Sequence, residues 1–268
     1  MPLSPQPKIV SQGASATSAI MKVLILGGTA EASALAHTLA AHDIPAVFSY
    51  AGRVATPKAQ PIPTRIGGFG GVDGLISYLF ACGITHIVDA THPFAGQMSR
   101  NAVLAAKSTG IPLIALTRPP WQPVEGDRWH HVRDIDAAVD AVAGEPRRIL
   151  LAIGRMHLEA FRDQPQHHYL LRLVDTPENP MPLPDCTVTI DRGPFTVEGD
   201  LHLLRKHRID LVVSKNAGGQ GAAAKITAAR QLGLPVLMID RPALPERREV
   251  HDSDAVLDWL HHGADLGV

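Results

Sequence analysis

The sequence predicts an α/β protein built from two Rossmann-like parallel-sheet domains that face a central cleft. Three observations support this fold class. Short apolar runs alternate with helical segments throughout residues 22–118, which is the pattern of β-α-β units. The second half of the chain repeats the order of the first half. Polar and glycine-rich residues follow the apolar runs, at the edge where parallel sheets bind ligands.

The first half supplies strands and helices in alternation. KVLILGG (22–28) is an apolar run that ends in two glycines, and the helical segment TAEASALAHTLAAH follows it directly. PAVFSY (45–50) and IPTRIGGFGG (62–71) contain the next two expected strands. THIVDA (85–90) and PLIALTR (112–118) frame a further helical segment. Strands and helices at this pitch predict a parallel sheet covered on both faces.

The second half reads as a repeat of the first. GIP at 110–112 recurs as GLP at 233–235, and an Arg-Pro pair follows each at the same interval. VRDIDAAVDAV (132–142) likewise resembles VHDSDAVLDWL (250–260), and ILLAIG opens the second half as VLILG opens the first. Coincidence among common βα patterns is the alternative, but ordered matches favour two related domains.

These matches suggest how the chain is divided. We expect a disordered or non-native leader at 1–20, a first domain at 21–120, a connector with a strand-helix piece at 121–147 and a second domain at 148–268. The leader is polar and lacks the apolar core of a signal peptide. The sequence leaves open which sheet the Asp-rich pieces 130–142 and 248–261 join.

Composition argues against several functional classes. The net charge is −1, without a basic block, so a nucleic-acid partner is not expected. No stretch is long and apolar enough to span a membrane. The 14 histidines are scattered and the two cysteines, Cys82 and Cys186, are isolated, so no metal site is expected. Lone cysteines suit a reducing compartment, and a cytoplasmic protein is expected.

The turn GGTAEA (27–32) suggests a phosphate site between the first strand and the first helix. Gly27 and Gly28 let the backbone approach a phosphate, and Thr29 can cap the helix or donate a hydroxyl. The helix N-terminus favours an anion by roughly 0.3–1 kcal/mol. The dinucleotide fingerprint is incomplete, because its third glycine is missing. Glu31 repels phosphate but can accept from a ribose hydroxyl, and a turn without ligand is the alternative.

The exits of the next two strands favour NADP(H) as the ligand. SYAGR (49–53) has no acid where an NAD site usually has one, and Arg53 can pair with a 2′-phosphate. A solvated surface arginine is the alternative. GGFGG (67–71) can lie against the adenine or nicotinamide, or it can be a plain turn. The cofactor-binding residues expected here are Ser49, Gly52, Arg53, Gly68 and Phe69.

DATHPFA (89–95) stands at the mouth of the fourth predicted strand. Asp89 is expected to hold this loop by hydrogen bonds to backbone amides. Thr91 and His92 are expected on the cofactor side of the cleft. An imidazole titrates near neutrality, so His92 is the candidate proton donor. Helix capping together with Thr91, or positioning of the cofactor amide, is the alternative role of His92.

The second half offers cations and another glycine-rich turn. RGPF (192–195) and SKNAGGQGAAAK (214–225) suit a carboxylate or a phosphate. Each cation alone is more often a solvated surface group, but as a set they suggest a polyanionic substrate. The expected substrate-binding residues are Arg155, Arg192, Gly193, Phe195, Lys215, Asn216, Gly218, Gly219 and Lys225, with Arg172 adding positive charge on the same face.

Six of these motifs together resemble the precorrin-6A (precorrin-6x) reductase family of cobalamin biosynthesis. GGTAEA, SYAGR, GGFGG, DATHPFA, RGPF and SKNAGGQG occur in this order over nearly the whole chain after residue 20. The resemblance implies NADPH-dependent reduction of one double bond of precorrin-6A to give precorrin-6B in the cytoplasm. It also implies that the cations meet substrate carboxylates. Ala217 stands where the family more often has serine, which puts a hydroxyl contact there in doubt.

Other functions stay open at this level. They are another NADP-dependent tetrapyrrole oxidoreductase, a nucleotide-free two-domain tetrapyrrole synthase or lyase, and a nucleotide-sensing module. Arg53 and GGTAEA argue against the nucleotide-free enzyme, and the cationic second half argues against a sensor. Transient contact with neighbouring pathway enzymes, the oligomeric state, the hydride face and the aerobic or anaerobic branch of the pathway are not decided by the sequence.

Overall fold

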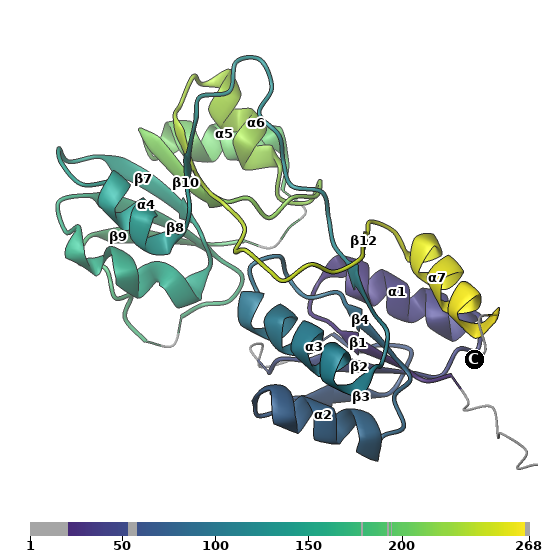
Figure 1. Cartoon of the computed structure of the whole chain (residues 1–268). Helices are drawn as coiled ribbons and strands as arrows, with labels where there is room; N and C mark the ends of the chain where they lie inside the picture. The colour runs from purple at the N-terminus through teal and green to yellow at the C-terminus, as the bar shows by residue number, and fades with distance from the viewer. Residues whose placement is uncertain (1–20, 53–57, 178, 192, 194, 266–268) are drawn as a thin grey trace, which may run out of the picture.

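The computed structural model describes residues 21–52, 58–177, 179–191, 193 and 195–265, and it contains two α/β domains (Figure 1). Each domain is built on a six-stranded sheet whose paired strands all run parallel. The predicted fold class, two Rossmann-like parallel-sheet domains, is therefore confirmed.

The first sheet has the strand order β12-β5-β4-β1-β2-β3. Its strands are β1 (Val23–Leu26), β2 (Ala46–Tyr50), β3 (Thr64–Ile66), β4 (His86–Asp89), β5 (Leu113–Leu116) and β12 (Glu249–Val250). Its helices are α1 (Ala30–Ala41), α2 (Gly71–Ala81), α3 (Gly96–Thr109) and α7 (Ser253–Asp265).

Both faces of this sheet are buried. Along β1, Val23 and Ile25 pack in the core with α1 and α7, whereas Leu24 and Leu26 pack in the core with α2 and α3. Successive residues of a strand point to opposite faces. A continuous apolar run such as VLIL is therefore what a strand covered by helices on both sides requires.

The second sheet has the matching order β6-β11-β10-β7-β8-β9. Its strands are β6 (Trp129–Val132), β7 (Arg148–Ala152), β8 (His168–Leu173), β9 (Cys186–Ile190), β10 (Leu211–Lys215) and β11 (Val236–Ile239). Its helices are α4 (Ile135–Ala141), α5 (Val197–Lys206), α6 (Ala224–Gln231) and the 3₁₀ helix η1 (Arg155–Asp163), which stands where the first domain has α1. The expected repeat units, β4-α3-β5 and β10-α6-β11, lie in separate sheets, as predicted.

The two Asp-rich strand-helix pieces exchange domains. Strand β6 belongs to the connector and pairs with β11 of the second sheet. Strand β12 follows the second domain in sequence but pairs with β5 of the first sheet, and α7 then packs against α1. The second domain expected at 148–268 must be corrected, because residues 249–265 complete the first domain. Their local sequence patterns are alike, so the choice of sheet depends on long-range packing.

The carboxyl ends of the central strands meet between the domains. The chain crosses from one domain to the other twice, through residues 117–128 and residues 240–248 (Figure 1). In the parts of the chain that the structure describes, no helix combines the length and the apolar character needed to cross a bilayer.

Candidate active site between the domains

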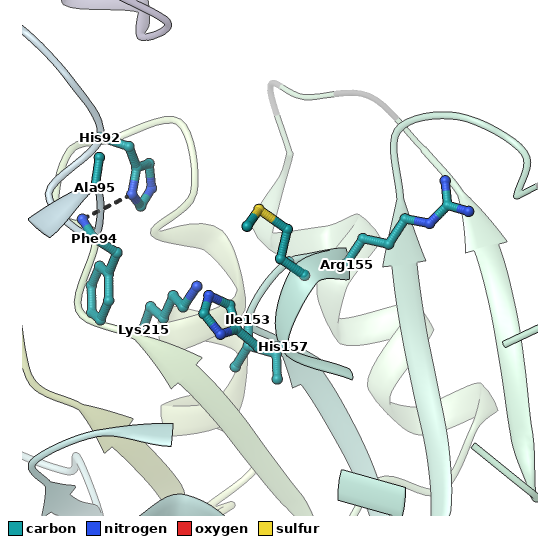
Figure 2. Close-up of a pocket in the computed structure, with 9 residues that line it drawn as sticks. His92, Phe94, Ala95, Ile153, Arg155, His157 and Lys215 are labelled. Carbon is teal, nitrogen blue, oxygen red and sulfur yellow. Dashed lines mark hydrogen bonds between the residues drawn. The ribbon is translucent and has the colours of Figure 1, made fainter. Parts of the chain in front are cut away.

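A cavity of about 200 Å³ lies where the strand mouths of the two domains meet (Figure 2). The first domain contributes the β4-α3 loop, and the second contributes the ends of β7 and β10 with the first turn of η1. A second cavity of about 400 Å³ shares Phe94, His157 and Lys215 with it and adds Arg100 and Arg133. The first cavity is lined by His92, Phe94, Ala95, Ile153, Gly154, Arg155, Met156, His157 and Lys215.

The β4-α3 loop presents His92 through a set of short local bonds. The Oδ1 atom of Asp89 accepts hydrogen bonds from Thr91 N at 3.2 Å and Thr91 Oγ1 at 2.7 Å. Asp89 therefore holds the loop as predicted. The Phe94 amide donates to His92 Nδ1 at 3.2 Å, and Ala95 N donates to the His92 carbonyl at 2.7 Å. Because Nδ1 accepts, a neutral His92 carries its proton on Nε2.

The second domain places Lys215 opposite this loop. Lys215 ends β10, and its Nζ atom lies 5.2 Å from the centroid of the Phe94 ring, a cation–π contact between domains. The His157 side chain lies beside Lys215 in the close-up (Figure 2). Arg155, predicted as a substrate ligand, borders the same cavity. The wall combines cations with the exposed apolar side chain of Met156.

The predicted phosphate turn requires glycine at two positions and leads directly into α1. Gly28 has φ +119°, a conformation that favours glycine, and a Cβ there would meet open space. A Cβ on Gly27 would lie 2.2 Å from the Phe48 ring, so this position has no room for one. Thr29 caps α1 by accepting from Ala32 N at 3.1 Å, and its hydroxyl donates to the Ala90 carbonyl at 2.9 Å. The turn is therefore tied to β4.

Glu31 does not stand alone beside this turn. Its Oε1 atom lies 3.6 Å from Arg118 Nε, and both side chains are largely buried. Arg118 lies at the start of the first crossover, so a cation from this crossover offsets the carboxylate next to the helix N-terminus. This pairing reduces the repulsion that Glu31 would otherwise exert on a phosphate.

The mouths of β2 and β3 are organised by Arg65, which the sequence reading missed. Its Nη1 atom donates to Ser49 Oγ at 2.8 Å and to the Gly67 carbonyl at 2.9 Å, and Nη2 donates to the Gly68 carbonyl at 3.0 Å. The guanidinium lies 3.9 Å from the Phe69 ring centroid. Predicted residues Ser49, Gly68 and Phe69 thus share one cation.

Of the other two cofactor-binding residues predicted after β2, the structure describes Gly52 but not Arg53. Gly52 has φ +77°, which favours glycine, and it lies next to Gly67. Arg53 lies outside the described residues. The sequence signal that could have identified Arg65 is its position near the end of a short strand beside GGFGG. That signal is weak, because a strand-end arginine is most often solvated.

The glycine-rich loop after β10 contacts the connector. The Asn216 carboxamide accepts from Trp121 N at 2.8 Å and donates to the Trp121 carbonyl at 3.0 Å. The Trp121 indole donates to the Gly219 carbonyl at 2.9 Å. A Cβ on Gly218, at φ +70°, would lie 2.2 Å from the Pro119 carbonyl oxygen. Asn216, Gly218 and Gly219 therefore fasten the connector and are not among the residues that line the cavity.

Lys225 is also separated from the cavity. It is partly buried, and its ammonium donates to the Ala222 carbonyl at 2.7 Å and lies 4.8 Å from the Trp121 ring centroid. Desolvation lowers the pKa of Lys225 to about 8, although Asp200 acts in the opposite direction. The structure therefore distinguishes the two lysines of one motif, because Lys215 reaches the cavity and Lys225 does not.

Phe195 of the RGPF motif borders a different cavity, of about 280 Å³, at the mouth of β8. The Arg172 guanidinium carbon lies 4.3 Å from the centroid of the Phe195 ring, and Arg172 is paired with the buried Asp200. Gly193 approaches the Phe195 ring, and Arg192 lies outside the described residues. This group is not brought together with His92 and Lys215 in one cavity.

Asp89 has a second partner that sequence reasoning missed. Arg247, just before β12, donates from Nη1 to Asp89 Oδ2, and the two side chains are 8% and 1% exposed. Arg247 Nε also donates to Glu249 Oε1 at 3.2 Å. The pair joins residues 158 positions apart in sequence. Neither residue's local context predicts it, because the contact exists only through the exchange of β12.

The fold and the cavity define a two-domain Rossmann-like α/β protein with a candidate active site between its domains. The family model described as precorrin-6x reductase CbiJ/CobK matches residues 22–261. The chain belongs to this family.

Individual relatives agree over nearly the whole chain. Precorrin-6A reductase of Rhodobacter capsulatus is 59% identical over 91% of this chain and 97% of its own length. The precorrin-6A reductase of Rhodococcus erythropolis is 48% identical over 89% of this chain and 97% of its own length. A cobalt-precorrin-6A reductase of Priestia megaterium is 30% identical over 83% of this chain and 91% of its own length. A solved structure of CobK precorrin-6A reductase superposes with a TM-score of 0.85 at 59% identity, covering 90% of this chain and 96% of the other.

Proposed function

We propose that this protein reduces one double bond of precorrin-6A with NADPH, giving precorrin-6B in cobalamin biosynthesis. Family membership supports the reductase chemistry. Relatives at 43–59% identity are named for precorrin-6A, whereas relatives at 25–30% are named for cobalt-precorrin-6A. This division favours the cobalt-free substrate. The cytoplasm, where the pathway's NADPH is available, is the proposed location.

The observation that carries the proposal is the cavity shared by the two domains. His92 and Phe94 come from the first domain and Lys215 and His157 from the second, so all four border one space. A reductase must hold a cofactor and an acceptor against each other and keep water away. A cavity whose opposite walls belong to different domains suits this task, because each domain can bind one of the two reactants.

The residues of the first domain fit a dinucleotide. Gly27 and Gly28 leave the N-terminus of α1 open, Thr29 fixes its cap, and Arg118 offsets the charge of Glu31. When bound, NADPH supplies the hydride. Ser49, already hydrogen-bonded to Arg65, is proposed to meet the 2′-phosphate together with Arg53. Thr91 and His92 are proposed to face the nicotinamide end, and Gly52, Gly68 and Phe69 complete the set.

The residues of the second domain fit a flat polycarboxylate. Arg155 and Lys215 line the first cavity, and Arg133 lines the second, where Arg100 of α3 adds a cation from the first domain. Met156, 65% exposed, offers apolar surface to the macrocycle. We propose that carboxylates of the substrate pair with these cations, as charge-assisted hydrogen bonds. Arg172, which is paired with Asp200, and Phe195 line a separate cavity.

His92 is the proposed proton donor. It lines the cavity, and a neutral His92 carries its proton on Nε2, because Nδ1 accepts from Phe94 N. His157 on the opposite wall provides an internal comparison, since it is the other imidazole that borders this cavity in the described part of the chain.

The test uses the purified protein with precorrin-6A and either NADPH or NADH, followed at the nicotinamide absorbance. We expect NADPH oxidation and a one-to-one yield of the dihydro product, with kcat/KM favouring NADPH by roughly 10- to 100-fold. The variant Arg53→Ala should lose most of this preference. Absence of NADPH oxidation would contradict the proposed function, and equal use of both cofactors would contradict the cofactor assignment alone.

A further inference from the structure

One crossover segment is fastened to the strand mouths of both domains. We call residues 240–248, between β11 and β12, the strap (Figure 1). It carries an arginine near each end. Arg241 donates from Nε to the Asn216 carbonyl at 3.0 Å and from Nη2 to the Ala217 carbonyl at 3.2 Å. These carbonyls directly follow Lys215, so this end of the strap meets the second-domain mouth beside the cavity.

The other end of the strap meets the first-domain mouth through Arg247 and Asp89. Both side chains are almost fully buried. Burial of a carboxylate is costly unless a cation pairs with it, and Arg247 is paired with Asp89 here. One oxygen of Asp89 binds Arg247, and the other binds Thr91 N and Oγ1. A single carboxylate therefore connects the strap to the loop that carries His92 and Phe94.

The middle of the strap contacts α3, because the Ala243 carbonyl accepts a hydrogen bond from Arg100 Nη1 at 3.4 Å. Pro242 and Pro245 restrict its backbone. A cavity of about 390 Å³ lies between the strap, Pro93 of the β4-α3 loop and Pro120 of the other crossover. A stiff segment attached at its two ends acts as a spacer, because its length fixes the separation of the two points that it joins.

We propose that Arg247 is a positioning residue for the reaction. Through Asp89 it holds the β4-α3 loop in the conformation that places His92 and Phe94 on the cavity wall, and through the strap it fixes that wall relative to Lys215. Arg247 does not border the cavity of about 200 Å³. Its effect on the reaction passes through Asp89 and Thr91. Only the kinetic part of the test below rests on the proposed function.

The first arm of the test measures hydrogen exchange in the full-length protein without any ligand. Arg247→Met removes the guanidinium but keeps an unbranched side chain, and Arg248→Met is the matched control at the exposed neighbouring position. We expect the Thr91 amide to exchange at least about 10-fold faster in Arg247→Met, with β1 amides changed by less than about 2-fold. Arg247→Lys should restore part of the protection.

The second arm measures steady-state kinetics. Arg247→Met should lower kcat by roughly 10- to 100-fold while the Kd for NADPH stays within about 2-fold of the parent, because misplacement of a wall residue affects chemistry before cofactor binding. Arg248→Met should change neither value. A purely structural role of Arg247 would lower Tm but leave the kcat of the folded enzyme unchanged.

An alternative variant keeps the test decisive if Arg247→Met does not fold. The double variant Asp89→Asn/Arg247→Met leaves no isolated buried charge, and it should show the same fast exchange at Thr91 and the same loss of kcat. Parent-like exchange at Thr91 in a folded variant would overturn the proposal. Failure of the parent to oxidise NADPH with precorrin-6A would overturn the proposed function and leave the exchange result standing.

Discussion

The loops that follow β4 and β10 occupy matching places in the two sheets, yet they hold different partners. The first presents His92 and Phe94 to the shared cavity, and the second directly follows Lys215, which borders the same cavity from the end of β10. Each also fastens a crossover, but Asp89 does so through an ion pair with Arg247 and Asn216 through neutral hydrogen bonds to Trp121. Reactive and fastening groups are therefore close neighbours in sequence, and their effects must be separated by experiment.

A second matched pair lies at the mouths of β2–β3 and β8. In each domain a guanidinium stacks on a phenylalanine that directly precedes the N-cap of a helix, Arg65 on Phe69 and Arg172 on Phe195. In the first domain Arg65 binds Ser49 and two loop carbonyls. In the second, Arg172 is neutralised by Asp200. The acid makes the second mouth less suited to a phosphate, which supports the proposal that the first domain binds the nucleotide.

The largest predicted effect is the loss of kcat when His92, the imidazole of the β4-α3 loop, is replaced. His92→Gln should lower kcat by roughly 10²- to 10⁴-fold, because it removes a group that can transfer a proton. The Kd for NADPH should change much less than kcat. His157→Gln is the matched substitution on the opposite wall, and pH profiles of kcat for both variants check the assignment. Full turnover by His92→Gln across pH 6–8 would show that His92 is not the proton donor.

The fastening role of the β10 loop predicts a loss of stability. Gly218→Ala should lower the free energy of unfolding by about 3 kcal/mol, because a side chain there is strained at positive φ and meets the Pro119 carbonyl. Gly221→Ala is the control, since a Cβ at Gly221 meets nothing within 4 Å. Urea unfolding at constant m-value measures both. Similar stabilities of the two variants would contradict the tight contact between loop and connector.

The two lysines of the second-domain motif predict a contrast in substrate binding. Lys215→Met should raise KM for precorrin-6A by roughly 10-fold or more, because it removes a charge-assisted contact to a carboxylate, while NADPH affinity stays unchanged. Lys225→Met should leave KM unchanged, since Lys225 does not border the cavity. A weakened NADPH affinity in Lys215→Met would reverse the assignment of cofactor and substrate to the two domains.

The smallest predicted effect is a pH dependence of stability from Lys225. Its pKa falls from 10.5 in the unfolded chain to about 8 when buried, so between these values the unfolded state binds more protons. Stability should therefore rise with pH, by about 1 kcal/mol between pH 8 and pH 9 relative to Lys225→Met. Parallel stability curves of the parent and Lys225→Met over this range would show that Lys225 does not titrate there.

The fold class could be predicted because it depends on local patterns. VLIL, HIVD and LVVSK are apolar strands between helical segments, and both the two sheets and the repeat units follow from that alternation. The assignment of the strand-helix pieces to sheets could not be predicted. Strands β6 and β12 belong to similar sequences, and a local pattern does not specify which of two similar sheet edges a strand joins.

The candidate site was predictable where one residue acts from one strand end. His92, Lys215 and Arg155 fall in the cavity for this reason. Arg247 was missed because its partner Asp89 lies 158 positions away in sequence, and Arg65 was missed because an arginine near the end of a short strand is most often solvated. Asn216 and Gly218 were read as ligands, since a glycine-rich turn that accepts a ligand and one that accepts a neighbouring segment of the same chain have the same sequence features.

The exchange of β12 and α7 also determines how the chain folds. The first-domain core needs Val256, Leu257 and Leu260, which follow the whole second domain in sequence. A nascent chain cannot complete its first domain until the last helix has been synthesised, and a fragment ending at residue 128 would expose the surface that α7 covers. We therefore expect a single cooperative calorimetric transition for the intact chain, although its cores belong to two domains.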